Sequence, residues 1–240
     1  MSHLQRGFAL LDHLSAGPAR LRHETELSLA LTPVMLIVHG AGGSEVERLT
    51  TRAYALSQQL EQSPILFPAL RGLHYVAWAQ GQLQTALELA ERLLELAQSS
   101  TDAGVQLEAH LAMGTTLWYG GRCGPAIRYL EQGLSVPSPT RRLPVNRVPH
   151  PELSCLLYSA QVLWYLGYPD QAQRRLQKGL TLAAQLAQPY HLVWGQHLGA
   201  MFYMLIRQRP QAQVLIEAVV QAATAHGITL AVTGGQLMQE

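Results

Sequence analysis

Histidine and glutamate are the side chains here that could perform metal or acid–base chemistry, so their spacing decides whether such a site exists. The chain has ten histidines, but none forms H-E-x-x-H or another one-turn pair with acidic support. Glu88, Glu91 and Glu95 recur at helical spacing near Arg92, which is typical of a solvated helix face. We therefore expect no catalytic residues, no metal site and no cofactor.

The segment VMLIVHGAGGS, Val34 to Ser44, is the stretch that most favours an enzyme. An apolar run followed by His39, Gly40 and more glycines resembles the strand and oxyanion loop of an α/β-hydrolase. Such an enzyme needs a G-x-S-x-G nucleophile elbow, which the sequence lacks, and a phosphate-binding loop would need a Lys after the glycines. We predict a helix end and an interhelix loop here, with a hydrolase using the His39-Gly40 loop as the alternative.

Composition removes several other classes of function. Hydrophobic residues make up 48% of the 240 residues and charged residues 14%, which allows a sizeable core. The net charge of +1 gives no reason to expect nucleic acid or an anionic membrane as a partner. Cys123 and Cys155 fit no disulfide framework, and the residues after Met1 lack a signal-peptide pattern. We expect a cytoplasmic setting.

An internal repeat organises the sequence. Four segments align without gaps, starting at Trp78, Trp118, Trp164 and Met204. In the first three, Gly follows three residues after the Trp and Ala five residues after the Gly, and the fourth copy keeps the Ala as Ala212. Gly at such a break suits the left-handed conformation that ends a helix. Each copy therefore predicts a helix, a glycine turn and a second, amphipathic helix.

The first helix of each pair is expected upstream of its turn, over Phe67–Gln80, Leu107–Tyr119, Leu153–Leu166 and Val193–Ile206. Interhelix loops are expected at Ser99–Gly104 and at the proline-rich stretch Val136–Pro151. An earlier, irregular pair has its first helix near His23–Val38. The sequence thus predicts an all-α, right-handed α-solenoid of about five antiparallel helix pairs.

The expected division of the chain follows the same register. Residues 1–22 are the C-terminal part of a truncated repeat, and residues 23–65 form an irregular repeat. Residues 66–227 form three to four regular repeats with the proline-rich loop at 136–151. Residues 228–240 begin a further, broken-off repeat, so that open ends at both termini could support self-association.

These copies resemble tetratricopeptide repeats, with their G-x-L/x-x-x-A core and small residues at helix contacts. More narrowly, RGFALLDHL, SEVERLTTRAYALSQQL, ILFPALRGL and GYPDQAQRRLQKGLTLAAQL resemble the repeat tail of large bacterial predicted ATPases. In that family the tail follows a STAND-type ATPase, often with an adenylate or guanylate cyclase domain upstream. The resemblance implies a regulatory or sensor module that binds a protein or peptide, or the upstream domains themselves. The ATPase and cyclase motifs are absent here.

The resemblance also implies where a partner would bind, because the first helices of stacked repeats line a concave groove. Family positions two, five, nine, twelve and thirteen of each first helix, with the marker Ala as position twenty, face this groove. On this chain they include Arg71, Tyr75, Trp78, Glu108, Thr115, Trp118, Tyr119, Gln161, Trp164, Tyr165, His197, Met201 and Met204. The Trp residues would either bind a partner or pack between repeats.

Overall fold

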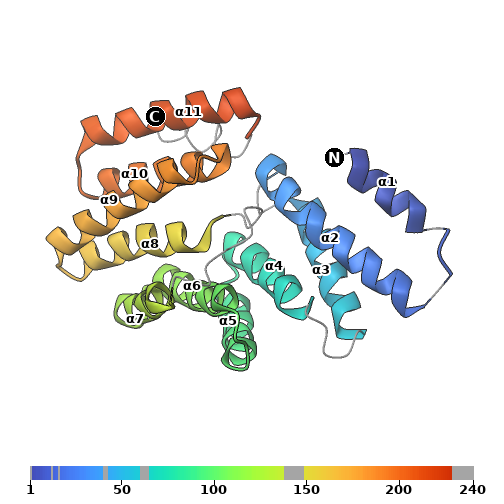
Figure 1. Ribbon diagram of the computed structural model, residues 1–240. Coiled ribbons are helices and arrows are strands. Elements are labelled where there is room, and N and C mark those ends of the chain that lie inside the picture. Colours follow the sequence, from blue (N-terminus) through green and yellow to red (C-terminus); the bar gives the residue numbers. More distant parts are fainter. Residues whose placement is uncertain are drawn as a thin grey trace. The chain divides into compact units, whose positions relative to one another are not determined.

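The computed structural model describes residues 2–11, 13–15, 17–39, 43–59, 65–137 and 149–228, and over these ranges the chain is helical with no strand (Figure 1). The helices are α1 (Ser2–Leu11), α2 (Pro18–His39), α3 (Ser44–Gln59), α4 (Leu66–Ala79), α5 (Leu83–Gln98), α6 (Ala103–Tyr119), α7 (Cys123–Ser135), α8 (Pro151–Tyr165), α9 (Pro169–Gln185), α10 (Pro189–Leu205) and α11 (Arg209–His226). The chain divides into two compact units, Met1–Leu96 and Ala97–Glu240. In the described ranges, no helix is long and apolar enough to span a bilayer.

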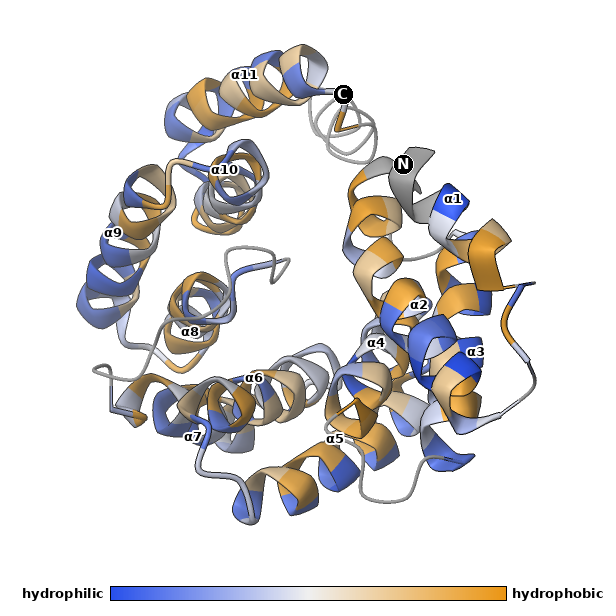
Figure 2. Cartoon of the chain, turned by 45° about the vertical axis from the view of Figure 1, so that its right-hand side comes forward, coloured by the Kyte–Doolittle hydropathy of each residue, from blue (hydrophilic) through white to orange (hydrophobic). Residues whose placement is uncertain are grey.

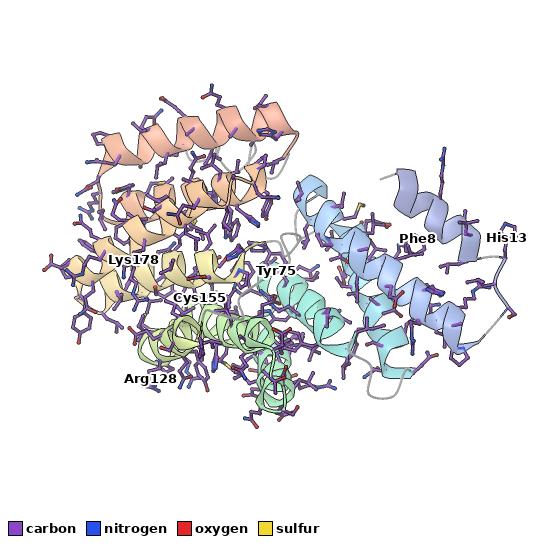
Figure 3. All side chains as sticks on the ribbon, in the orientation of Figure 1. Phe8, His13, Tyr75, Arg128, Cys155 and Lys178 are labelled. Carbon is purple, nitrogen blue, oxygen red and sulfur yellow. The ribbon has the colours of Figure 1, made fainter. Side chains whose placement is uncertain are left out.

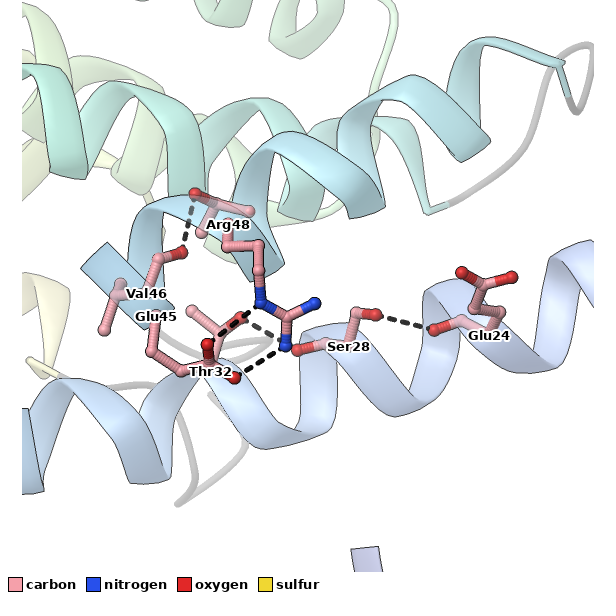
Figure 4. Close-up of polar contacts among 7 residues, drawn as sticks. Glu24, Ser28, Thr32, Glu45, Val46 and Arg48 are labelled. Carbon is pink, nitrogen blue, oxygen red and sulfur yellow. Dashed lines mark hydrogen bonds and ion pairs between the residues drawn. The ribbon is translucent and has the colours of Figure 1, made fainter. Parts of the chain in front are cut away.

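The first unit is built around α2, α3 and α4. Its core joins apolar residues of the three helices, with Phe8 of α1 packed against it; the buried members are Leu31, Met35, Leu36, Val46, Leu49 and Val76. Thr25, Ser28 and Thr32 are also buried in α2, and each hydroxyl donates to the carbonyl oxygen one turn earlier. Because the helix itself satisfies these hydroxyls, it can bury them without a partner from α3 (Figure 4).

Two ion pairs with exposed arginine side chains, Arg52–Glu24 and Arg48–Glu45, lie on the helices α2 and α3 that form this core. Arg52 Nε donates to Glu24 Oε1 at 2.7 Å and so joins α3 to α2. Within α3, Arg48 makes two hydrogen bonds to the Glu45 carboxylate, at 2.6 and 2.9 Å (Figure 4). Both hydrogen-bonded carboxylates raise the pKa of their arginine partners further above the usual value.

Helix α2 differs from the prediction at both ends. It begins at Pro18 instead of near His23, with proline at a first helical position, where its missing N–H is harmless. It continues through His39, so the run from Val34 to His39 is helical. The strand that the hydrolase alternative needs is therefore absent from this run, because Met35 and Leu36 belong to a helical core stripe. Gly40 to Gly42 lie outside the described residues.

In the part of the second unit that the structure describes, the helices form three pairs, α6–α7, α8–α9 and α10–α11 (Figure 1). Successive pairs pack through α7 against α8 and through α9 against α10, and the first helices α6, α8 and α10 also contact their neighbours. Figure 2 shows the hydrophilic residues of α9 gathered on the side away from α8 and α10. The first helices α6 and α8 are buried along most of their length, and α8 contacts α6, α7, α9 and α10.

Four interhelix turns share one backbone conformation. Gly81, Gly121 and Gly167 have φ of 73°, 74° and 82°, which confirms the left-handed glycine positions predicted from the sequence. At each turn, the N–H of the left-handed residue donates to the carbonyl oxygen three residues earlier. The N–H of the following residue donates to the carbonyl oxygen five residues before it, as Gln82 N does to Ala77 O at 2.9 Å. Arg207 occupies the same place in the fourth copy, with φ of 59°.

The alanines that follow these turns have equivalent surroundings. Ala86, Ala126 and Ala172 are fully buried, and Ala212 is 3% exposed. The N–H of each bonds to the carbonyl four residues back, which is the first residue after the left-handed turn position. The repeat seen in the sequence is therefore a repeat of backbone and burial. The division into residues 1–22, 23–65, 66–227 and 228–240 stays a prediction, and residues 138–148 and 229–240 lie outside the described ranges.

Candidate functional site

A pocket of about 310 Å³ opens in the second unit between α6, α8 and α10. The pocket is lined by residues at equivalent repeat positions of the first helices. Gln161 and Met201 hold position nine, Trp118 holds position twelve, and Tyr119, Tyr165 and Leu205 hold position thirteen. All of these except Leu205 are among the residues predicted for the groove. Leu205 has the same repeat position as Tyr119 and Tyr165, so the register itself could have identified it. The role of these residues in binding stays a prediction.

Aromatic rings of successive repeats form two edge-to-face pairs in and beside this pocket. The centroids of Trp118 and Tyr165 lie 5.0 Å apart with planes at 66°, and those of Tyr119 and Tyr158 lie 6.2 Å apart at 74°. Both geometries are favourable for aromatic quadrupoles. Tyr119 and Tyr165 are nevertheless 45% and 60% exposed. The pairs therefore link neighbouring repeats and still present apolar surface to solvent.

Gln161 is the most buried polar side chain of the pocket. It is 4% exposed, and its Nε2 atom has no hydrogen-bond partner among the described residues. An amide carries two N–H donors and a carbonyl acceptor, and burying such a donor unpaired is unfavourable. In the equivalent position of the preceding repeat, the hydroxyl of Thr115 instead donates to the carbonyl of Leu111 at 2.8 Å. Gln161 thus has hydrogen-bonding capacity that its own repeat does not use.

The pocket lining carries no charge at neutral pH. Its side chains are aromatic, aliphatic, thioether or amide, and none is a carboxylate, an imidazole or a basic group. Partial burial raises the pKa of Tyr119 above its usual value, while a hydrogen bond with Tyr158 opposes this shift. The site can therefore offer dispersion contacts, ring faces and an amide, but neither an ion pair nor an acid–base group.

The remaining predicted residues of the second unit have different surroundings. The Trp164 ring lies edge-on to the ring of Phe202, a fully buried residue of α10, at 6.2 Å. This contact makes Trp164 part of the packing between two repeats. Met204 is 46% exposed, and Glu108 is half-buried on α6.

His197 belongs to a stack along α10. Its ring lies 6.0 Å from that of Trp194, which in turn is stacked on Tyr190. Burial lowers the pKa of His197, so the ring is held in its neutral form. The Trp194 Nε1–H donates to Ser154 Oγ at 3.1 Å, joining α10 to α8. Trp194 was not among the predicted residues, although its register position is that of Glu108.

In the first unit, Arg71, Tyr75 and Trp78 form a cluster of their own on α4. The Tyr75 and Trp78 rings are stacked at 5.6 Å, and the Arg71 guanidinium lies over the Tyr75 ring (Figure 3 labels Tyr75). Arg71 Nη1 also lies 3.2 Å from Nδ1 of the buried His74. His74 therefore packs as a core residue. Among the described residues, no group of His, Cys, Asp and Glu could hold a metal ion.

Comparison with known proteins agrees with this architecture. Residues 66–137, which span α4 to α7, match the sequence model of the family described as Tetratricopeptide repeat. No curated protein matches the chain. Two crystal structures of nearly identical TPR-like repeats from a Podosopora anserina putative kinesin light chain are similar to it. The first, a form with one substitution, has 21% identity and a TM-score of 0.51, and covers 89% of this chain and 99% of that one. The second has 22% identity and a TM-score of 0.50, with coverages of 88% and 99%.

At these identities the structural likeness concerns the fold alone. Tetratricopeptide repeats generally mediate protein–protein interaction, and the matches indicate no enzyme family. The predicted fold class is confirmed: the chain is an all-α solenoid of TPR-like antiparallel helix pairs.

Proposed function

We propose that this chain is a non-catalytic interaction module, and that the surface formed by α6, α8 and α10 binds a segment of a partner protein. The observation that carries the proposal is the pocket to which three successive first helices contribute side chains. Such a site exists only when the repeats are stacked, as expected for a groove that reads an extended ligand. Its uncharged lining supports binding rather than catalysis.

The resemblance to the repeat tail of STAND-type ATPases supports a finer proposal. We place the module in the cytoplasm, where partner binding regulates an ATPase or a cyclase domain of the same parent protein. The first test is the coding DNA upstream of Met1. An open frame with G-x-x-x-x-G-K-[ST] supports this parentage. A stop codon directly upstream contradicts it and leaves the binding proposal intact.

Self-association is the second candidate, because large apolar side chains are exposed near both ends. Leu10 of α1 and Val214 of α11 are 63% and 65% exposed. Sedimentation velocity over a concentration series distinguishes the two functions. Concentration-dependent dimers that Val214→Ser or Leu10→Ser dissolves support self-assembly. A monomer at all concentrations rejects it.

Binding through the pocket is tested by changing one exposed tyrosine in it and one outside it. Peptides that bind the full chain are selected from a random display library and measured by fluorescence polarisation. Tyr165→Ala should weaken binding about tenfold or more, as expected for an aromatic contact at the centre of an interface. Tyr168→Ala is the matched control, because Tyr168 is 52% exposed in the next turn but does not line the pocket. Equal binding by the two variants would reject the site.

A further inference from the structure

We infer that the pocket between α6, α8 and α10 selects an uncharged, apolar side chain of an extended peptide, and that the Gln161 amide hydrogen-bonds the backbone of that peptide. This inference rests on the proposed binding function and adds the chemistry of the ligand. Two observations carry it independently. One is the composition of the pocket lining, and the other is the unpartnered buried amide.

The lining decides which side chain can enter. Trp118, Tyr119 and Tyr165 supply aromatic surface, and Met201 and Leu205 supply flexible aliphatic surface on the facing helix α10. A charged side chain that entered would lose water without meeting a counter-ion, because no lining residue is charged. A leucine, methionine or aromatic side chain would exchange water for these contacts. A volume of about 310 Å³ suits one or two such side chains.

Gln161 decides how the backbone is held. Its Nε2 atom has no hydrogen-bond partner among the described residues, although the side chain is 4% exposed. A peptide carbonyl accepting from this N–H would satisfy the donor, and the amide carbonyl could accept from a peptide N–H in return. Every peptide offers these groups, so Gln161 would supply affinity while the apolar pocket supplies selectivity. Capture of a terminal carboxylate is disfavoured, since the lining contains neither Lys nor Arg.

The first experiment determines the preferred side chain. A random twelve-residue peptide library is selected by mRNA display on the full-length chain, in parallel on Tyr165→Ala and on Tyr168→Ala. The expected motif has one dominant Leu, Met or aromatic position depleted of Asp, Glu, Lys and Arg. Tyr168→Ala should retain this motif, and Tyr165→Ala should lose it. A motif anchored by a charged side chain overturns the inference.

The second experiment tests the amide. Gln161→Leu keeps the approximate volume and removes the unpaired polar group, so the thermal midpoint should be unchanged or higher. The selected peptide should bind this variant about five- to tenfold more weakly, the fold-change expected for one net hydrogen bond. Replacing each peptide carbonyl in turn by a thioamide, a weaker acceptor, should reveal one sensitive position. The thioamide at that position should cause no further loss of affinity for the Gln161→Leu variant, because the hydrogen bond is already absent. Unchanged affinity of Gln161→Leu, or additive losses, overturns the proposed hydrogen bond.

Failure of this inference differs from failure of the proposed function. If the selected peptides carry a charged anchor and their binding still depends on Tyr165, the proposed binding function holds, but the proposed apolar ligand is wrong. A library that yields no binder on the wild-type chain overturns both. If deleting residues 229–240 is what permits binding, the occupant is this chain's own terminus, and the inference of an external peptide falls.

Discussion

Arg207 holds a strained backbone conformation at a position where three other repeats have glycine. Its φ of 59° and its turn hydrogen bonds, Arg207 N to Met204 O at 3.0 Å and Gln208 N to Tyr203 O at 2.9 Å, match those of the glycine turns. A side chain with a Cβ clashes with the following carbonyl in this conformation. We therefore predict that Arg207→Gly stabilises the protein.

The magnitude follows from two opposing terms. A left-handed conformation costs a non-glycine residue about 1–2 kcal/mol. Glycine also gives the unfolded chain more conformational freedom, which lowers the free energy of unfolding by about 0.4–1 kcal/mol. The Arg207 side chain is exposed, so its removal breaks no buried contact. The net gain should be roughly 0.5–1 kcal/mol, or about 1–4 °C in thermal midpoint for a chain of this size.

Circular dichroism at 222 nm during thermal and urea unfolding measures this effect, and two further variants make it specific. Gly167→Arg is the reverse change, at a turn where a Cβ would meet nothing within 4 Å, so only backbone strain should lower its midpoint. Arg209→Gly removes an arginine from the first position of α11, where φ is not positive, and should not stabilise. A lower or unchanged midpoint for Arg207→Gly, with Gly167→Arg harmless, would refute the reasoning.

Three further changes follow from packing and burial. Gly195→Ala places a Cβ 2.6 Å from that of Ala183, so α9 and α10 must separate; we expect a loss of about 1–3 kcal/mol in urea unfolding, relieved by Ala183→Gly. Gly124→Ala, in the first turn of α7, meets nothing within 4 Å and should gain up to about 0.5 kcal/mol in the same assay, less than in the middle of a helix. Burial lowers the pKa of His197 below its usual value of about 6.5, so as pH falls the unfolded chain takes up the proton first. Stability should be level above about pH 7 and decline below about pH 6.5, and His197→Gln should flatten this decline in melts across pH. His110, whose pKa burial also lowers, should account for part of the remaining slope.

The elements that follow from local chemistry could be predicted. The turns need glycine at positive φ and the second helices need a small buried alanine, and these residues recur at fixed spacing. The sequence therefore predicts the turns and the second helices in the correct register. The first helices α6, α8 and α10 begin two to four residues earlier than the hydrophobic pattern predicts. Helix α6 begins at Ala103 because Asp102 caps it by accepting from Gly104 N at 2.7 Å. Helices α8 and α10 begin at Pro151 and Pro189. The capping aspartate and the prolines precede the first apolar residue of each helix, so hydrophobic periodicity alone does not detect these starts.

The tryptophans show where prediction from the repeat ends. Trp118 and Trp164 have the same place in successive copies, so the register predicts the same surface for both. What each ring contacts depends on the next repeat: Trp118 lies against the exposed Tyr165, and Trp164 lies near the fully buried Phe202. The contacts of each ring are therefore set by positions that vary between copies, and whether either ring binds a partner stays a prediction. Both rings join neighbouring repeats, and Trp118 in addition lines the pocket, whereas Trp164 does not.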